Sequence, residues 1–153
     1  MTEGSTNYGT RIRWSNIATA NAIPDSWDAT DTTKSAGFND LVQMQSPILD
    51  GVTLGTNFII YSKTDVYLME FVGGTFIFNF RKIFSDIGII NQNCAIEVDS
   101  RHYVFSDNDI YVHDGNSRES IVDQRVKNYI FGGLDTSKTS VCFVARHPEL
   151  EEI

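Results

Sequence analysis

Two histidines stand out as candidate metal ligands. His102 and His113 lie eleven residues apart, with two aspartates close by. A zinc site needs three or four converging ligands, and a catalytic one keeps a position open. The residues 44 positions before the two histidines are Phe58 and Met69. Positions that take Phe and Met are packing positions, so we expect both histidines to be structural.

A second candidate is a calcium loop around the acidic segment 107–109. Asp114, Gly115 and, five residues after Asp114, Glu119 follow this segment. A calcium loop of the helix-loop-helix type needs regularly spaced oxygen ligands and a distant bidentate Glu, and the central part of that pattern is missing. Asp and Asn also close turns with their own side chains. We therefore expect hydrogen-bonded turns and no bound metal or cofactor.

Two Ser-x-x-Asp segments, Ser62 to Asp65 and Ser106 to Asp109, occur at the same offset of 44. They partly resemble the Asp-box of sialidase-like propellers. That box has Gly and an aromatic residue after the Asp, whereas Val-Tyr and Ile-Tyr follow directly here. A hydrogen-bonded turn explains both segments better.

Motifs for nucleophilic catalysis and for phosphate binding are missing. The sequence contains no Gly-x-Ser-x-Gly elbow. The pairs Gly73-Gly74 and Gly132-Gly133 lack the Lys and the spacing of a phosphate loop. We therefore expect no enzyme and no catalytic residues.

The charge balance limits the possible partners. The chain of 153 residues has a net charge of −8, from 20 acidic and 12 basic residues. Tight binding to nucleic acid needs clustered Lys and Arg. The one small basic spot, Arg81-Lys82 near Gly88, favours a surface patch or a contact between subunits over DNA readout. Because no segment approaches the roughly 20 apolar residues of a membrane span, we expect no membrane insertion.

The elements that position these residues are mainly strands. Residues 1–10 are rich in Gly, Ser, Thr and Asn and predict a flexible tail. Arg11–Ser15 alternates polar and apolar residues, which favours a strand, and 16–46 predicts a long ordered loop. The two cysteines, Cys94 and Cys142, sit in apolar stretches and are expected to be buried free thiols.

The segment after Pro47 contains an internal repeat. Strand-like runs rich in β-branched and aromatic residues follow in the same order twice, and Tyr67 and Tyr111 lie 44 residues apart. A period in the low forties is typical of propeller blades, each a four-stranded antiparallel sheet. We predict repeat units at about 48–80 and 92–117, and an incomplete third at 139–153.

One short helix is predicted between these blades, over Glu119–Phe131, because Ile121, Val122, Val126 and Ile130 recur near helical spacing and two glycines follow. The predicted fold is therefore mainly β, with β-propeller-like blades in one domain over residues 11–153. A single small sheet cannot cover its own apolar face, so each blade needs neighbours. Because 153 residues hold only about three and a half such units, two interpretations stay open: the sequence is a fragment, or other chains or copies complete a ring.

The strand residues also support a family resemblance. The stretches Ile48–Met69, His102–Phe105 and Asp109–Gly115, with the opening Arg11–Ser15 and the closing 148–152, resemble the tail nozzle proteins of short-tailed phages. These are proteins of the tail tubular protein B and packaged-DNA-stabilisation types. Family members are several hundred residues long, so the resemblance implies that these 153 residues correspond to part of a subunit.

The resemblance implies a structural role in a virion. Subunits of the family form a hexameric ring below the portal and adaptor, with propeller-like domains outside and a channel through which DNA passes without sequence-specific binding. The implied partners are identical subunits and tail adaptor or portal-side proteins. The implied location is the phage tail, after a soluble stage in the host cytoplasm.

Two other functions stay open at this stage. A carbohydrate-binding or glycan-hydrolysing propeller would need two carboxylates roughly 5–10 Å apart in a cleft. The sequence offers Glu97, Asp65, Asp109 and Asp114 but does not place them together. An interaction scaffold of cellular origin is the third possibility, because a fold alone does not determine function.

Overall fold

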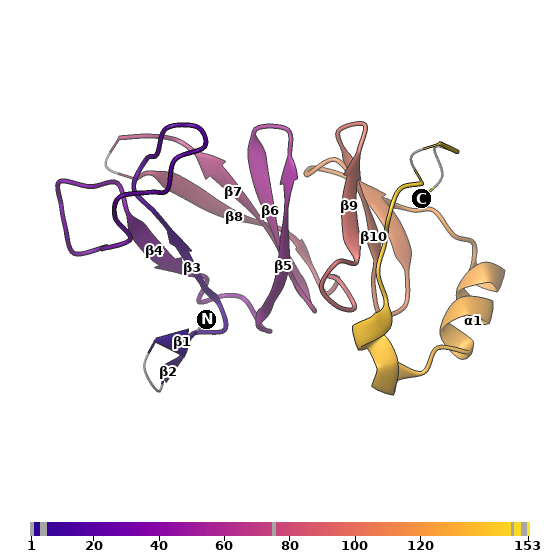
Figure 1. Cartoon of the computed structure of the whole chain (residues 1–153). Helices are drawn as coiled ribbons and strands as arrows, with labels where there is room; N and C mark the ends of the chain where they lie inside the picture. Colours follow the sequence, from indigo (N-terminus) through magenta and orange to yellow (C-terminus); the bar gives the residue numbers. More distant parts are fainter. Residues whose placement is uncertain (1, 4–5, 75, 148, 151–152) are drawn as a thin grey trace. The chain divides into compact units, whose positions relative to one another are not determined.

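The computed structural model describes residues 2–3, 6–74, 76–147, 149–150 and 153. The predicted mainly β fold is confirmed, because all paired strands are antiparallel and helices are few (Figure 1). The chain divides into two compact units, Met1–Met44 and Gln45–Ile153. The sequence had predicted a single domain over residues 11–153.

The first unit contains two short antiparallel pairs. The strands β1 (Thr2–Glu3) and β2 (Thr6–Asn7) pair within the segment predicted to be a loose tail. The predicted strand at residue 11 is present as β3 (Arg11–Trp14), and it pairs with β4 (Gly37–Asp40). The prediction of one loop over 16–46 missed β4, because Gly, Asn and Asp are poor strand formers.

Side chains at both ends of β3 hold this pair together. The Arg11 guanidinium forms two hydrogen bonds with the Asp40 carboxylate, at 2.7 and 2.8 Å. The Trp14 indole N–H donates to the Ser35 carbonyl at 2.8 Å. The Trp14 ring covers Gly37 so closely that a Cβ there would lie 2.7 Å from it. The loop between β3 and β4 is therefore tied back to the strands.

The second unit begins with a four-stranded sheet, here called the first sheet. Its order is β5-β6-β7-β8, each strand antiparallel to its neighbour. The last strand continues to residue 85, beyond the predicted end of this repeat unit at about 80. The strands are β5 (Ile48–Leu54), β6 (Asn57–Ser62), β7 (Asp65–Phe71) and β8 (Phe78–Ser85).

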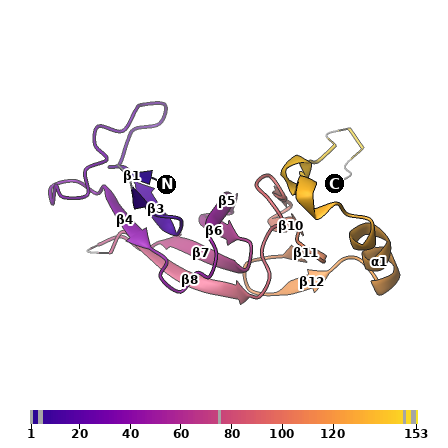
Figure 2. The same cartoon turned by 90° about the horizontal axis from the view of Figure 1, so that it is seen from below.

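A second four-stranded sheet follows, called the second sheet, in the order β9-β10-β11-β12 (Figures 1 and 2). Its edge strand β12 occupies residues that were predicted to begin a helix. All three residues of β12 are polar and exposed, so they lack the alternating apolar pattern of a strand. The strands are β9 (Ala95–Val98), β10 (Arg101–Phe105), β11 (Ile110–His113) and β12 (Arg118–Ser120).

The two sheets share one pairing register. Each of the eight residue pairs that join β9 to β10 and β10 to β11 corresponds to a pair 44 positions earlier in the first sheet. For example, Ile60 pairs with Tyr67, and Val104 pairs with Tyr111. Because a slip of one residue would turn every side chain to the opposite face, the matching register gives both sheets the same two faces.

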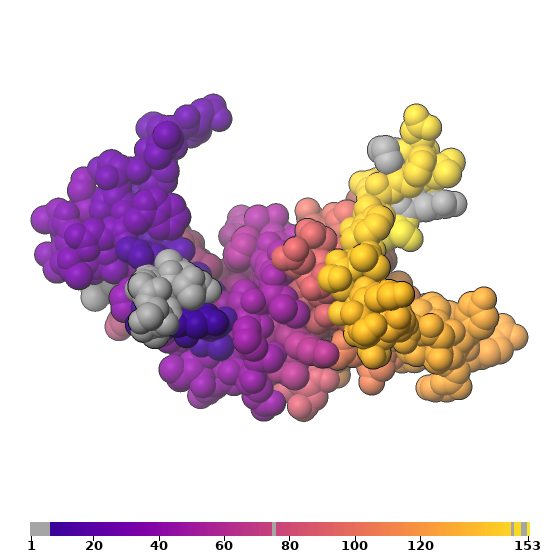
Figure 3. Space-filling model, turned by 60° about the horizontal axis from the view of Figure 1, so that its bottom comes forward, coloured from indigo at the N-terminus to yellow at the C-terminus, as the bar shows by residue number. Residues whose placement is uncertain are grey.

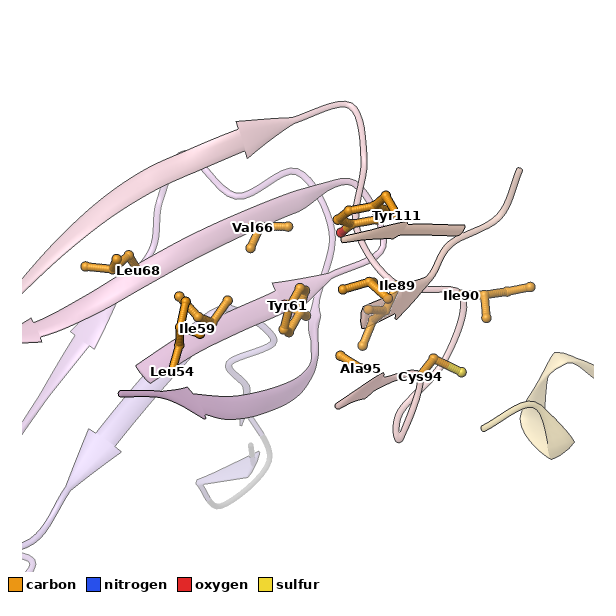
Figure 4. Close-up of a cluster of buried hydrophobic side chains, with 11 residues drawn as sticks. Leu54, Ile59, Tyr61, Val66, Leu68, Ile89, Ile90, Cys94, Ala95 and Tyr111 are labelled. Carbon is orange, nitrogen blue, oxygen red and sulfur yellow. The ribbon is translucent and has the colours of Figure 1, made fainter. Parts of the chain in front are cut away.

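The two sheets pack against each other around one hydrophobic core. Figure 4 shows side chains of the first sheet, among them Ile59 and Tyr61, pointing toward those of the second sheet and of the linker between them. The two sheets use opposite faces for this core. The first sheet contributes the face that contains Ile59, and the second sheet contributes the face that contains Val104, which is equivalent to Ile60. The buried members are Leu54, Ile59, Tyr61, Val66, Leu68, Ile89, Ile90, Cys94, Ala95, Val104 and Tyr111.

The C-terminal part differs from the prediction of a third repeat. Helix α1 (Gln124–Gly132) begins five residues later than predicted and is capped by Asp123, which accepts a hydrogen bond from the Val126 N–H. A 3-10 helix, η1 (Thr136–Val141), follows, and residues 142–147 form no strand. Figure 3 shows this part, in orange and yellow, beside the second sheet. The strand start predicted for 150–153 lies partly outside the described residues.

Candidate functional site

The most polar part of the interior is a three-residue network between the two sheets. Tyr61 on β6 directs its hydroxyl between His102 on β10 and His113 on β11, which face each other across neighbouring strands. The Tyr61 Oη lies 2.7 Å from His102 Nδ1 and 2.5 Å from His113 Nε2. All three side chains are at most 2% exposed. The network therefore links the two sheets in a buried layer.

The surrounding groups determine where each proton of this network lies. The backbone N–H of Gly115 donates to His113 Nδ1 at 3.1 Å, so the proton of the neutral His113 ring is on Nε2 and is donated to Tyr61. Tyr61 in turn donates its own proton to His102 Nδ1. The remaining His102 N–H, on Nε2, donates to the carbonyl of Thr53 at 2.7 Å. Every polar atom of the three rings has a partner, as a stable buried network requires.

Burial keeps these groups neutral. Desolvation, together with the neighbouring His102, lowers the pKa of His113 to about 3. Desolvation also lowers the pKa of His102 and raises that of Tyr61 well above its usual value. A general base must reach a substrate proton and titrate near the working pH. The three side chains are buried and hydrogen-bonded to one another, so they connect the two sheets.

The first Ser-x-x-Asp turn surrounds a buried carboxylate. The Ser62 hydroxyl accepts the Asp65 N–H at 2.9 Å and closes the turn between β6 and β7. The Asp65 side chain is 1% exposed and accepts from Gln45 N–H at 2.7 Å and from the Lys82 ammonium at 2.9 Å. These donors outweigh desolvation, so the pKa of Asp65 is lowered. The turn is a structural unit with its charge neutralised.

The second Ser-x-x-Asp turn holds its carboxylate with different partners. Asp109 accepts from the Ser120 hydroxyl at 2.7 Å and from Lys127 of α1 at 3.0 Å. Ser120 pairs with Tyr111 as Lys82 pairs with Tyr67, so it occupies the place that Lys82 has in the first sheet. The strand β12 has no lysine at this place, and Lys127 of α1 supplies the positive charge instead.

The remaining acidic candidates also have partners in local structure. Asp114 accepts the backbone N–H groups of Asn116 and Ser117, at 2.9 and 2.8 Å, and these bonds lower its pKa. Glu97 accepts from the Ser100 N–H at 3.1 Å. Among the described residues, no three His, Cys, Asp or Glu side chains are placed to hold a metal ion.

The basic spot near Gly88 is divided by the fold. Lys82 turns to Asp65, whereas Gly88 lies against the turn that begins at Ser62. A Cβ at Gly88 would overlap the carbonyl oxygen of Ser62, which accepts the Ile89 N–H at 3.0 Å. The linker between the sheets is therefore packed directly onto the first Ser-x-x-Asp turn.

Both cysteines are free thiols, as predicted, although only Cys94 is fully buried. Its thiol donates to the Cys142 carbonyl at 3.3 Å, and desolvation raises its pKa to about 11. This contact attaches the segment after η1 to the core. A thiol with so high a pKa is a poor nucleophile.

The outer face of the second sheet carries an apolar groove of about 630 Å³. Tyr103, Phe105 and Ile110 form its floor, and Ile121 and Phe143 form part of its walls. None of the lining side chains carries a charge. The ring of Phe131 in α1 stacks on Phe105, with 5.5 Å between ring centres. Phe143, in contrast, is 72% exposed. The segment after β12 therefore covers this face only in part.

Sequence reasoning identified the two histidines but missed Tyr61, the residue that joins them. A signal was present in the repeat. Tyr61 corresponds to Phe105, and the histidines correspond to Phe58 and Met69, so three polar departures from the repeat occur together. Departures that can form hydrogen bonds with one another are the ones a buried layer tolerates.

The comparisons with known proteins add no assignment. No family model matches the chain, and no curated protein shows a significant match to its sequence. In the part of the chain that the structure describes, no helix is long and apolar enough to cross a membrane.

Proposed function

We propose that this chain is a structural component that assembles with copies of itself, and that it belongs to the tail nozzle of a short-tailed phage. The proposal rests mainly on the open groove on the second sheet. Its floor residues Tyr103, Phe105 and Ile110 correspond to Ile59, Tyr61 and Val66, which are completely buried in the first sheet. A face that forms the core in one repeat and lies open in the next is suited to a further partner.

The polar groups support a structural role over catalysis. Tyr61, His102 and His113 bind one another, while Asp65 and Asp109 each bind a lysine. A working active site leaves groups free to meet a substrate. For the same reason, no contact among the described residues favours the glycan-hydrolysing alternative.

The assembly we propose is a ring of propeller-like units around the DNA exit channel, with six copies as the family resemblance implies. Its partners are identical subunits and the adaptor or portal-side proteins of the tail. A net charge of −8 suits a wall along which DNA moves, because like charges repel and no condensed counterions are released by binding.

The proposal is tested on phage particles purified from cells that produce this chain. Antibodies against residues Gln45–Ile153 are expected to label the tail in electron micrographs, and mass spectrometry is expected to find the chain in intact particles. Particles whose tails have been removed serve as the control and should lose both signals. Particles that retain complete tails but lack the chain would rule out the nozzle assignment.

A further inference from the structure

The hairpin that joins β7 and β8 is longer than its counterpart in the second sheet. The pair Met69–Phe80 corresponds to the pair His113–Arg118. Ten residues separate the first two, whereas four separate the second two. The first sheet thus carries an extension of six residues that the shared fold does not need, since the second sheet closes the same strands without it.

This extension exposes large apolar side chains. Phe71, Val72 and Phe76 are 64%, 52% and 78% exposed, and Phe71 packs edge-on against Phe78 at 5.8 Å between ring centres. The matching turn in the second sheet is Asp-Gly-Asn-Ser, in which Asp114 binds the following backbone N–H groups. Ordinary turns carry polar residues of this kind. An aromatic extension at the same place indicates a surface that contacts another molecule.

The hairpin and the groove lie on different sides of this unit. Figure 1 shows that β7 and β8 extend away from α1 toward the turn that joins them. The groove is lined by residues of β10, β11 and the segments after β12, on the face of the second sheet opposite the core. The second sheet and the core therefore stand between them. A hairpin cannot reach the groove of its own chain, but it can reach that of another copy.

We propose that the β7–β8 hairpin of one copy docks into the groove of a second copy of this chain. The inference rests on the proposed function, because it supplies the contact by which copies would assemble. The groove is apolar, as are the exposed hairpin residues Phe71, Val72 and Phe76, and no side chain of the groove lining has a charge that would repel another copy of a chain with net charge −8. The volume of about 630 Å³ is in the range that encloses several ring-sized groups.

The geometry of this contact predicts how copies add to one another. Hairpin and groove are different surfaces, so each copy offers one of each, and contacts run head to tail. Such contacts give closed rings or open chains rather than two-fold dimers. A copy that has lost its hairpin can still receive a neighbour, and a copy that has lost its groove can still insert into one.

The experiment uses two single variants of the full chain, Phe76→Ser in the hairpin and Phe143→Ser in the groove, with Tyr129→Ser as the control. All three replace exposed side chains, so the fold should be unchanged, as thermal melting by circular dichroism will verify. In sedimentation velocity over a concentration series, each of the first two should weaken self-association at least about thirtyfold, the loss expected for a central aromatic anchor. Tyr129→Ser should assemble as the unchanged chain does.

Mixing the two variants provides the decisive measurement. Phe143→Ser keeps an intact hairpin and Phe76→Ser keeps an intact groove. The two variants should therefore form a one-to-one dimer that adds no further copies. Two-fold pairing of grooves would give no such rescue, and that result would overturn the proposal. Self-association that neither variant weakens, or an unchanged chain that stays monomeric, would also overturn it. The nozzle assignment is decided separately, by the particle labelling.

Discussion

The two sheets of the second unit have one register but differ in what covers them. On one face of the first sheet, Ile59, Tyr61 and Val66 are completely buried in the core shared with the second sheet. The equivalent face of the second sheet, with Tyr103 and Ile110, has only α1 and the segment after η1 over it. The 44-residue pattern therefore fixes strand pairing, whereas individual substitutions and loop lengths decide which face meets a neighbour.

The polar residues show the same separation of roles. Each sheet has a Ser-x-x-Asp turn, yet the first recruits a lysine from its own edge strand and the second recruits one from a helix. The trio of Tyr61, His102 and His113 has no counterpart elsewhere in the repeat. The trio lies where the two sheets meet, so its hydrogen bonds fix how the face of the first sheet packs on the opposite face of the second.

The largest effect is expected at the linker glycine. In Gly88→Ala, the new Cβ would overlap the Ser62 carbonyl oxygen, so the linker must leave the first turn and break its hydrogen bonds. We expect the free energy of unfolding to fall by at least about 4 kcal/mol, as measured by urea denaturation. Gly132→Ala, at the end of α1, is the control, because a Cβ there would meet no atom within 4 Å apart from its own helix backbone. If both variants lost similar stability, the linker contact would not matter.

The next effect is the response of the histidines to acid. The pKa of His113 is about 3 in the fold and near 6.5 in the unfolded chain. Between these values the unfolded state binds more protons, so stability is complete above about pH 6.5 and is lost as the pH falls toward 3. At pH 4.5 the expected loss from His113 alone is about 3 kcal/mol. Urea titrations from pH 7 to pH 4.5 measure it.

The control for this acid response is taken from the repeat itself. A triple variant, Tyr61→Phe with His102→Phe and His113→Met, places at each position the residue type of the equivalent position in the other sheet. An apolar trio has no group to protonate, so its stability should change much less over the same pH range. If the triple variant lost as much stability on acidification as the unchanged chain, the acid response would come from groups other than this trio.

The repeat also marks the limit of what the sequence could predict. The offset of 44 predicted the strands at β6, β7, β10 and β11, because matched residue types recur there with the alternation of a strand. The edge strand β12 was missed because its side chains are exposed, and exposed edge positions carry little apolar pattern. Tyr61 was missed because its partners are 41 and 52 residues away, a distance in sequence that local patterns do not read.

A smaller loss is expected from removing the central hydroxyl of the trio. In Tyr61→Phe, His102 Nδ1 and His113 Nε2 lose their shared partner in a buried layer. Leaving buried polar groups unpaired should cost about 2–3 kcal/mol, measured by urea denaturation at pH 7. The matched control is Phe105→Tyr, which adds a hydroxyl at the half-buried equivalent position facing the groove. A neutral result for Tyr61→Phe would show that the histidines find other partners.

The smallest effect is expected from the two Ser-x-x-Asp turns, and it tests whether a shared motif makes the same contribution to stability in both sheets. Asp65 is 1% exposed and Asp109 is 17% exposed, although both bind a lysine. In Asp65→Asn the ammonium of Lys82 loses its partner, and an amide must replace two charge-assisted bonds in the interior, which should cost about 2 kcal/mol. Asp109→Asn should cost about 1 kcal/mol or less, since water can reach Lys127. Urea denaturation of both variants at pH 7 measures the difference, and equal losses would mean that the helix-borne lysine is as tightly held as the strand-borne one.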